Sequence, residues 1–243
     1  MWQRWARGAI LGFTLWTAAV PAWAGDLTDF NSLMEGVASH NRVAIGYLRT
    51  GNTDLASLEI DRTREAWGKL MQRFGGRRPD MFEGNRLYRN FMTGVSARLV
   101  GAELLLNAGR PDAAMDSLSK LRGDFSALRQ ESGIVVLADC VRDANQAMDA
   151  LMVYNDRALD LANIETATDV AGKAAIYRHE LERCDGMAAE PVRSEAEFRR
   201  LIDGALASLA LIPKAIATRD ADLLHRVLIE LRSFDNLLAF RFG

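Results

Sequence analysis

The chain has 243 residues, of which 49% are hydrophobic and 26% charged, and its formal net charge is −2 at pH 7. This mildly acidic balance, with both signs interspersed, argues against nucleic acid and against an anionic membrane surface, because both attract basic proteins. The length suffices for one large domain or two small ones.

The first 24 residues are typical of a secretory signal peptide. Arg4 and Arg7 precede the uncharged apolar stretch Ala9–Val20, and Ala22-Trp23-Ala24 supplies small residues at the two positions that a signal peptidase recognises. We expect cleavage after Ala24, which leaves a periplasmic or secreted chain that begins at Gly25. A retained signal anchor is the alternative, but the apolar stretch is shorter than the about 20 residues of a membrane span. No later stretch predicts a span.

The mature sequence has a helix-forming composition that is interrupted at regular intervals. Prolines and β-branched runs are few, while Ala, Leu, Arg, Glu and Asp dominate. The breaks, roughly 56 residues apart, fall at Gly51-Asn52, at Gly109-Arg110-Pro111, near Asn163 and at Arg219-Asp220. This spacing predicts an all-α fold with eight helices as four antiparallel helical hairpins, packed as two four-helix bundles or one helical array.

The predicted domains follow from these hairpins. The signal peptide occupies residues 1–24, the first pair of hairpins 25–131, and the second pair 132–243. Within the last hairpin, Pro213 should kink the first helix near its end or stop it early.

Three of the four hairpins share an apolar pattern, which indicates an internal repeat. In each copy the pattern forms a seam, a stripe with alternating steps of four and three residues that faces a partner helix. The seam residues are Ala56, Ile60, Thr63, Trp67, Leu70 and Phe74, then Ala114, Leu118, Leu121, Phe125 and Leu128, then Leu224, Leu228, Leu231, Leu238 and Phe242. Asp235 is the one polar exception in the last seam. Arg64, Arg122 and Arg232 coincide in the three copies, and we interpret them as a solvated flank of the seam.

The two cysteines, Cys140 and Cys184, are predicted to form a disulfide. In an exported protein, an isolated pair favours a disulfide over two free thiols. Ala162 lies midway between them, next to the third break at Asn163. A hairpin with two arms of equal length would therefore bring the two cysteines side by side at its open end.

No constellation in the sequence indicates a catalytic or metal site. His40, His179 and His225 belong to separate hairpins, and Arg183 occupies the position where a HExxH zinc motif beginning at His179 needs its second histidine. The sequence has no CxxCH motif for covalent haem. A non-covalent haem held by a methionine and a histidine stays open.

We therefore interpret the mature protein as an exported, non-catalytic helical binding or interaction module. Its partner would be an unidentified protein or small molecule. The alternative hypothesis is a periplasmic carrier that holds a small ligand, a non-covalent haem or a metal in the bundle core. An enzyme ranks third, no cofactor is assigned, and the predicted site residues are Cys140 and Cys184 alone.

Overall fold

The computed structural model describes residues 23–243, which form helices joined by turns and loops. Within this range there is no strand, so the all-α prediction is confirmed for the described chain. The predicted signal peptide lies outside the described residues except for Trp23 and Ala24. The expected cleavage point after Ala24 falls in the first turn of the first helix.

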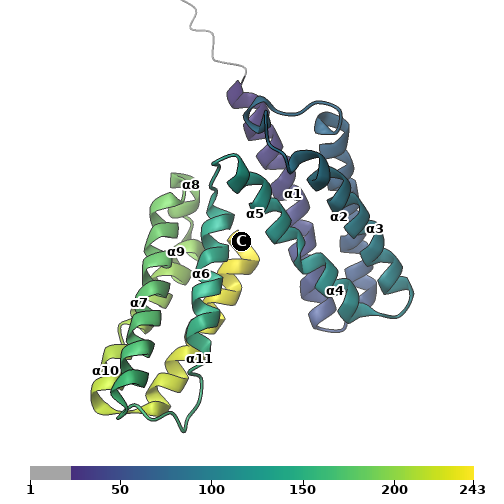
Figure 1. The fold of residues 1–243 in the computed structure, drawn as a ribbon. Helices are drawn as coiled ribbons and strands as arrows, with labels where there is room; N and C mark the ends of the chain where they lie inside the picture. Colours follow the sequence, from purple (N-terminus) through teal and green to yellow (C-terminus); the bar gives the residue numbers. More distant parts are fainter. Residues whose placement is uncertain (1–22) are drawn as a thin grey trace, which may run out of the picture.

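The first half of the described chain, residues 23–131, brings four helices around a common interior (Figure 1). Here α1 packs against α2, α2 against α3, α3 against α4, and α4 against α1, while α5 continues along α3 and α1. The elements are α1 (Trp23–Arg49), α2 (Thr53–Phe74), the short 3-10 helix η1 (Asp80–Phe82), α3 (Tyr88–Asn107), α4 (Pro111–Ser119) and α5 (Leu121–Glu131).

The second half, residues 137–243, repeats this ring-like packing with different connections. Its elements are α6 (Leu137–Met152), α7 (Ile164–Met187), α8 (Glu190–Arg193), α9 (Ala196–Leu209), α10 (Ile212–Thr218) and α11 (Ala221–Phe242). In the ring, α6 packs against α7, α7 against α9, α9 against α11, and α11 against α6. The short α10 lies against α7 and α11.

Local side chains explain where several helices begin and end. The side-chain oxygens of Asn52, Asn163 and Asp220 accept hydrogen bonds of 2.8–3.2 Å from backbone N–H groups in the first turns of α2, α7 and α11. Gly51 and Gly109 have φ angles of 77° and 69°, a left-handed conformation that glycine adopts without steric cost at helix ends. The sequence breaks at these positions are therefore true helix boundaries.

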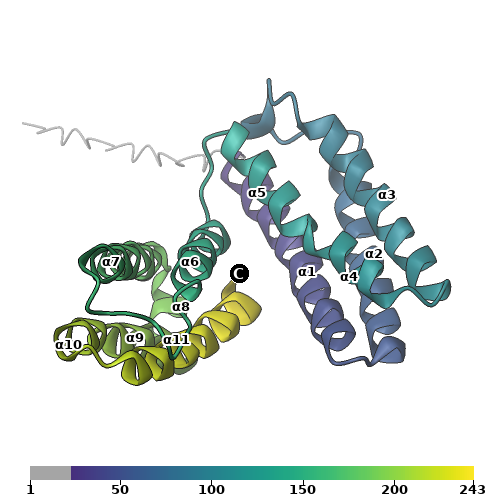
Figure 2. The same cartoon turned by 60° about the horizontal axis from the view of Figure 1, so that its bottom comes forward.

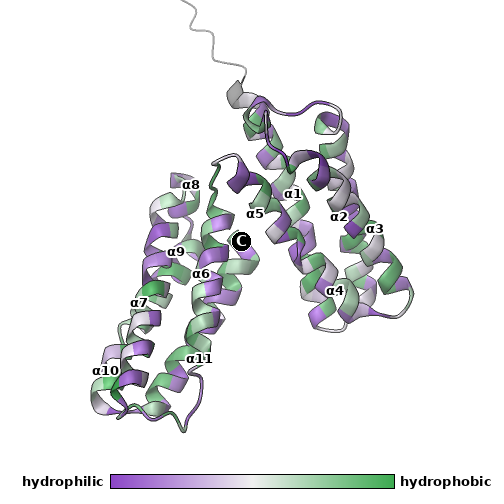
Figure 3. Ribbon diagram, in the orientation of Figure 1, coloured by the Kyte–Doolittle hydropathy of each residue, from purple (hydrophilic) through white to green (hydrophobic). Residues whose placement is uncertain are grey.

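Each half has its own hydrophobic core, with no residue shared between the two cores. The first centres on an aromatic cluster of Phe30, Phe74, Phe82 and Tyr88, whose ring centroids lie 4.8–6.3 Å apart. The predicted seam residues are buried, apart from the half-buried Phe242. Hydrophobic and hydrophilic residues alternate along the helices accordingly (Figure 3). The internal repeat itself stays a prediction.

The third hairpin differs from its prediction. The first arm, α6, ends at Met152, and residues 153–163 form a loop in place of a tight tip at Ala162. Asp156 and Asp160 accept hydrogen bonds of 2.9 Å from backbone N–H groups two residues further on. Such local bonds compete with the helix, which explains why the arms are unequal.

Two other expected helices are each divided into two pieces. The helix after Gly109 is interrupted at Lys120, between α4 and α5, and the helix after Ser194 is interrupted at Ala210-Leu211, between α9 and α10. Pro213 lies in the first turn of α10, where proline is tolerated, so the prediction of an early stop is confirmed. The expected set of eight helices is therefore too simple.

One segment of the described chain, Ala196–Thr218, is long and apolar enough to cross a membrane by length and composition alone. The expectation that no such stretch follows the signal peptide is therefore wrong. The segment spans α9 and α10, and its residues Phe198, Leu201, Ile202 and Ile212 are buried in the second core. Hydrophobic residues on all sides are also typical of a core helix.

The two halves lie side by side, joined by residues 132–136 (Figures 1 and 2). In both views the end of α11 lies between the halves. This placement brings the last residues of the chain against α1 and α5, and it forms the site described next.

Candidate ligand-binding site

A pocket with a volume of about 360 Å³ lies between the two halves. This volume falls in the range of about 300–1,000 Å³ that is usual for small-molecule sites. Its walls are α1 and α5 from the first half, with the start of α6, Val192 of α8 and the end of α11 from the second half. The pocket therefore exists only where the halves meet.

Part of the wall is apolar. It includes Met34, Ala38, Phe125, Leu137, Val192 and Phe242. Two of these rings are held by neighbours outside the pocket: Phe125 packs edge-to-face on Phe91, at 5.7 Å between ring centroids, and Phe242 on Phe198 at 5.1 Å. The apolar wall is thus anchored in both cores.

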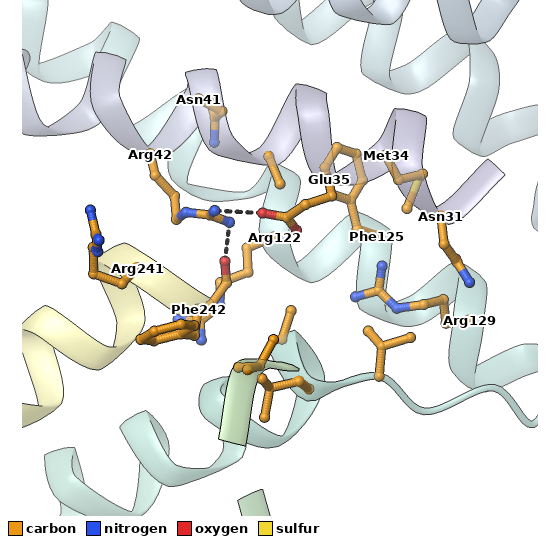
Figure 4. Close-up of a pocket in the computed structure, with 16 residues that line it drawn as sticks. Asn31, Met34, Glu35, Asn41, Arg42, Arg122, Phe125, Arg129, Arg241 and Phe242 are labelled. Carbon is orange, nitrogen blue, oxygen red and sulfur yellow. Dashed lines mark hydrogen bonds and ion pairs between the residues drawn. The ribbon is translucent and has the colours of Figure 1, made fainter. Parts of the chain in front are cut away.

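The rest of the lining is strongly cationic. Four arginines, Arg42, Arg122, Arg129 and Arg241, line the pocket, and Glu35 is the one acidic residue among the lining residues (Figure 4). The close-up shows Arg42 with dashed contacts to Glu35 and to a carbonyl oxygen beside Phe242. The four cations differ in how well the protein itself neutralises them.

Arg129 is fully neutralised. Its Nε and Nη2 donate hydrogen bonds of 2.8 and 2.6 Å to the two carboxylate oxygens of Asp139, and both residues are buried. Burial works to raise the pKa of Asp139, but the hydrogen bonds and charge of Arg129, with a Ser126 and a Val136 hydrogen bond, lower it below its usual range overall. The side edge of this guanidinium forms a fork that fits a carboxylate.

Arg42 and Arg241 are partly neutralised. Arg42 donates one hydrogen bond of 2.6 Å to Glu35 and another to the carbonyl oxygen of Gly243. Glu35 is exposed, so this ion pair is weakened by solvent. Arg241 is exposed and lies 3.9 Å from a carboxylate oxygen of Glu195.

Arg122 is the least neutralised of the four. Its Nη1 donates a hydrogen bond of 2.8 Å to the amide oxygen of Asn145, which is a neutral acceptor. Its Nε and Nη2 are buried and have no acceptor among the described residues. Burial lowers the pKa of Arg122 to about 10; the charge of Asp235 opposes this shift, while Arg142 and Arg42 add to it. The pocket thus contains a buried cation that has no hydrogen bond to a side-chain carboxylate among the described residues.

The side-chain amide of Asn145 links Arg122 to a buried carboxylate, that of Asp235. Asn145 donates from Nδ2 to Asp235 at 2.5 Å, and Arg232 lies 3.1 Å from the same carboxylate oxygen. Burial raises the pKa of Asp235 to about 6, and the charge of Arg232 and the Asn145 hydrogen bond limit the rise. Asn145 therefore separates Arg122 from this carboxylate.

Polar pairs connect α5 to α6 across the boundary. In antiparallel order they are Arg122 with Asn145, Ser126 with Arg142, and Arg129 with Asp139. At the boundary between the halves, these individual hydrogen bonds lie beside the apolar residues of the pocket wall.

The predicted cysteine pair lies outside the pocket lining. Cys140 in the first turns of α6 and Cys184 near the end of α7 are at disulfide distance, with 5.5 Å between their Cα atoms. The cysteines meet as expected, although the equal-armed hairpin that led to this expectation is wrong. A pair at bonding distance points to an oxidising, extracellular compartment.

The three histidines stay apart. His40 forms a 2.8 Å contact with Glu59, His179 is exposed on α7, and His225 lies on α11. Over residues 23–243, no group of three His, Cys, Asp or Glu side chains could hold a metal ion.

Sequence reasoning missed the pocket, and it misplaced Arg122. The interpretation of this arginine as a solvated flank is wrong, because its guanidinium is buried between α5 and α6. Its counterpart Arg64 does lie at the surface, with its side chain 41% exposed. The one sequence feature that could have indicated buried polar contacts near Arg122 was Asp235, a polar residue on an apolar seam.

Comparisons of the chain with protein-family models, with curated proteins and with solved structures find no match. The proposals below therefore rest on the chemistry of the pocket.

Proposed function

We propose that the protein is an exported, non-catalytic helical binding module that takes a small organic ligand into the pocket between its halves. The observation that carries this proposal is a cavity of about 360 Å³ with a largely apolar wall and a few convergent polar groups. This combination is typical of ligand sites, and such sites often occur between domains.

The proposal also covers the cellular location of the protein and the arrangement of its helices. Export to the periplasm is supported by the sequence of residues 1–24 and by the cysteine pair. The packing of the helices supports two four-helix bundles, one in each half, with the pocket at their boundary. In this arrangement each bundle supplies a rigid wall, and the ligand contacts both.

The alternative, a carrier of haem or metal in a bundle core, has no specific observation in its favour. The pocket lies outside both cores, and none of the three histidines lines it. We therefore do not propose it.

The test is a titration of the mature protein with N-phenyl-1-naphthylamine, a neutral dye that fluoresces in apolar surroundings. We expect a saturable increase in fluorescence at one dye per chain, and reversal by 1-decanol. No saturable signal would contradict the proposed function.

A further inference from the structure

We propose that the pocket selects an organic acid: a carboxylate with an apolar body, whose carboxylate is bound by Arg122 and Arg42. The inference rests on the proposed function and specifies the class of ligand. The apolar body would lie against Phe125, Met34 and Phe242, which line the same pocket.

The charge of the site favours an anion. Of the lining arginines, Arg129 is neutralised by Asp139 and Arg42 is paired with Glu35, while Arg122 has only the neutral Asn145. A buried cation without a counter-charge is costly, and an anionic ligand that pairs with it removes that cost. Glu35, which is exposed and lines the same pocket, would instead repel a second negative charge. The site therefore favours a monoanion.

The geometry of Arg122 specifies a carboxylate. Its two unpartnered nitrogens, Nε and Nη2, belong to the same edge of the guanidinium. Arg129, seven residues further along α5, uses this same edge, Nε and Nη2, to bind both oxygens of Asp139. Arg129 and Asp139 thus form the two-oxygen contact that Arg122 lacks. A planar, two-oxygen group fits this fork better than a spherical anion does.

The end of the chain occupies the space in front of this fork. A Cβ atom at Gly243 would lie 2.8 Å from Arg122 Nη2, and Arg42 donates a hydrogen bond to the Gly243 carbonyl. An incoming carboxylate would displace this backbone segment and take over the Arg42 hydrogen bond. The exchange keeps an oxygen acceptor on Arg42 and adds oxygen acceptors at the edge of Arg122 that has none.

Isothermal titration calorimetry on the mature protein tests the inference with three probes of equal chain length: decanoate, 1-decanol and decyltrimethylammonium. We expect decanoate to bind at least tenfold more tightly than decanol, and the cation to bind more weakly than decanol. Acetate should not bind measurably, because it lacks the apolar body.

The variant Arg122→Gln should lower the affinity for decanoate to that for decanol. Decanol should still bind saturably to this variant, which shows that the pocket is still folded. Arg122→Lys should restore only part of the preference, because a lysine lacks the fork. The matched control is Arg64→Gln, which removes the corresponding exposed arginine of α2 and should leave all affinities unchanged.

The outcomes separate the two proposals. Equal affinity for decanoate and decanol would overturn the selection of an acid and leave the binding function standing. A preference for decanoate that persists in Arg122→Gln would overturn the assignment of Arg122. If none of the probes binds, the proposed function and this inference both fail.

Discussion

The two hydrophobic cores and the boundary between them are built by different chemistry. Each core is a cluster of apolar side chains that follow the periodicity of the helices, such as Trp67 and Leu70 on α2. The boundary combines single polar pairs, such as Arg122 with Asn145, with the apolar residues of the pocket wall. We therefore expect the loss of a large core side chain to destabilise the fold more than the loss of one neutral hydrogen bond at the boundary. The predictions below exploit this difference.

The largest effect is expected for Trp67→Ala in the first core. Trp67 is 4% exposed, its Nε1 donates a 2.7 Å hydrogen bond to Ser96, and its ring packs edge-to-face on Phe91. Its removal should lower the free energy of unfolding by about 3–5 kcal/mol. Chemical denaturation measures this value. The control Leu104→Ala changes a residue that is 64% exposed, and should stay within about 0.5 kcal/mol of the wild type.

A comparable but smaller loss of stability is expected when the cysteine pair of the second core is reduced or replaced. A bond between Cys140 and Cys184 closes a loop with a sequence separation of 44 residues. On the chain-entropy model it stabilises the fold by about 4 kcal/mol, less where the native geometry is strained. Reduction, or the double variant Cys140→Ser with Cys184→Ser, should cost up to this amount. Thiol counting on the unfolded, unreduced protein should find no free thiol. Two free thiols per chain would show that the disulfide is absent.

The smallest effect on stability is expected for Asp235, a buried residue that accepts a hydrogen bond from Asn145. Its pKa is raised to about 6, so the folded state holds this proton more tightly than the unfolded state does. The resulting stabilisation is complete below pH 3.8, the usual pKa, and is lost as the pH rises through about 6.

In Asp235→Asn this particular loss should disappear. Between pH 4 and pH 7 the stability of the wild type, relative to the variant, should fall by roughly 2–3 kcal/mol. Denaturation at both pH values measures the difference. A difference that does not change with pH would show that Asp235 titrates normally and that its burial has little effect.

The sequence predicted the cores better than the boundary, for a physical reason. Apolar periodicity reports which face of a helix is buried, and the seam from Ala56 to Phe74 was correct residue by residue. The helix ends at Gly51 and Asp220 were also predictable, because their local geometry and capping are encoded by single residues. The loop at 153–163 was missed because it lies where a simple spacing argument places continuous helix.

The site could not be predicted because its residues lie far apart in the sequence. Arg42, Arg122 and Phe242 meet only once both halves have folded and come together. Each is ordinary in its local sequence, and an arginine beside a seam is usually solvated. Asn145 shows the difficulty most clearly. A carboxylate at this position would neutralise Arg122. The sequence shows that residue 145 is an amide, but only the packing of α5 on α6 shows that this amide is the partner of Arg122.

The central claim is that ligand binds at the boundary between the halves, and filling the pocket tests it most directly. Ala38 lines the pocket from α1, and its neighbour Ser39 is exposed outside the lining. The dye titration should be abolished in Ala38→Phe, whose ring occupies the cavity, and should be unchanged in Ser39→Phe, with both variants as helical as the wild type by circular dichroism. Undiminished binding in a folded Ala38→Phe variant would contradict the claim, because the dye would then bind elsewhere.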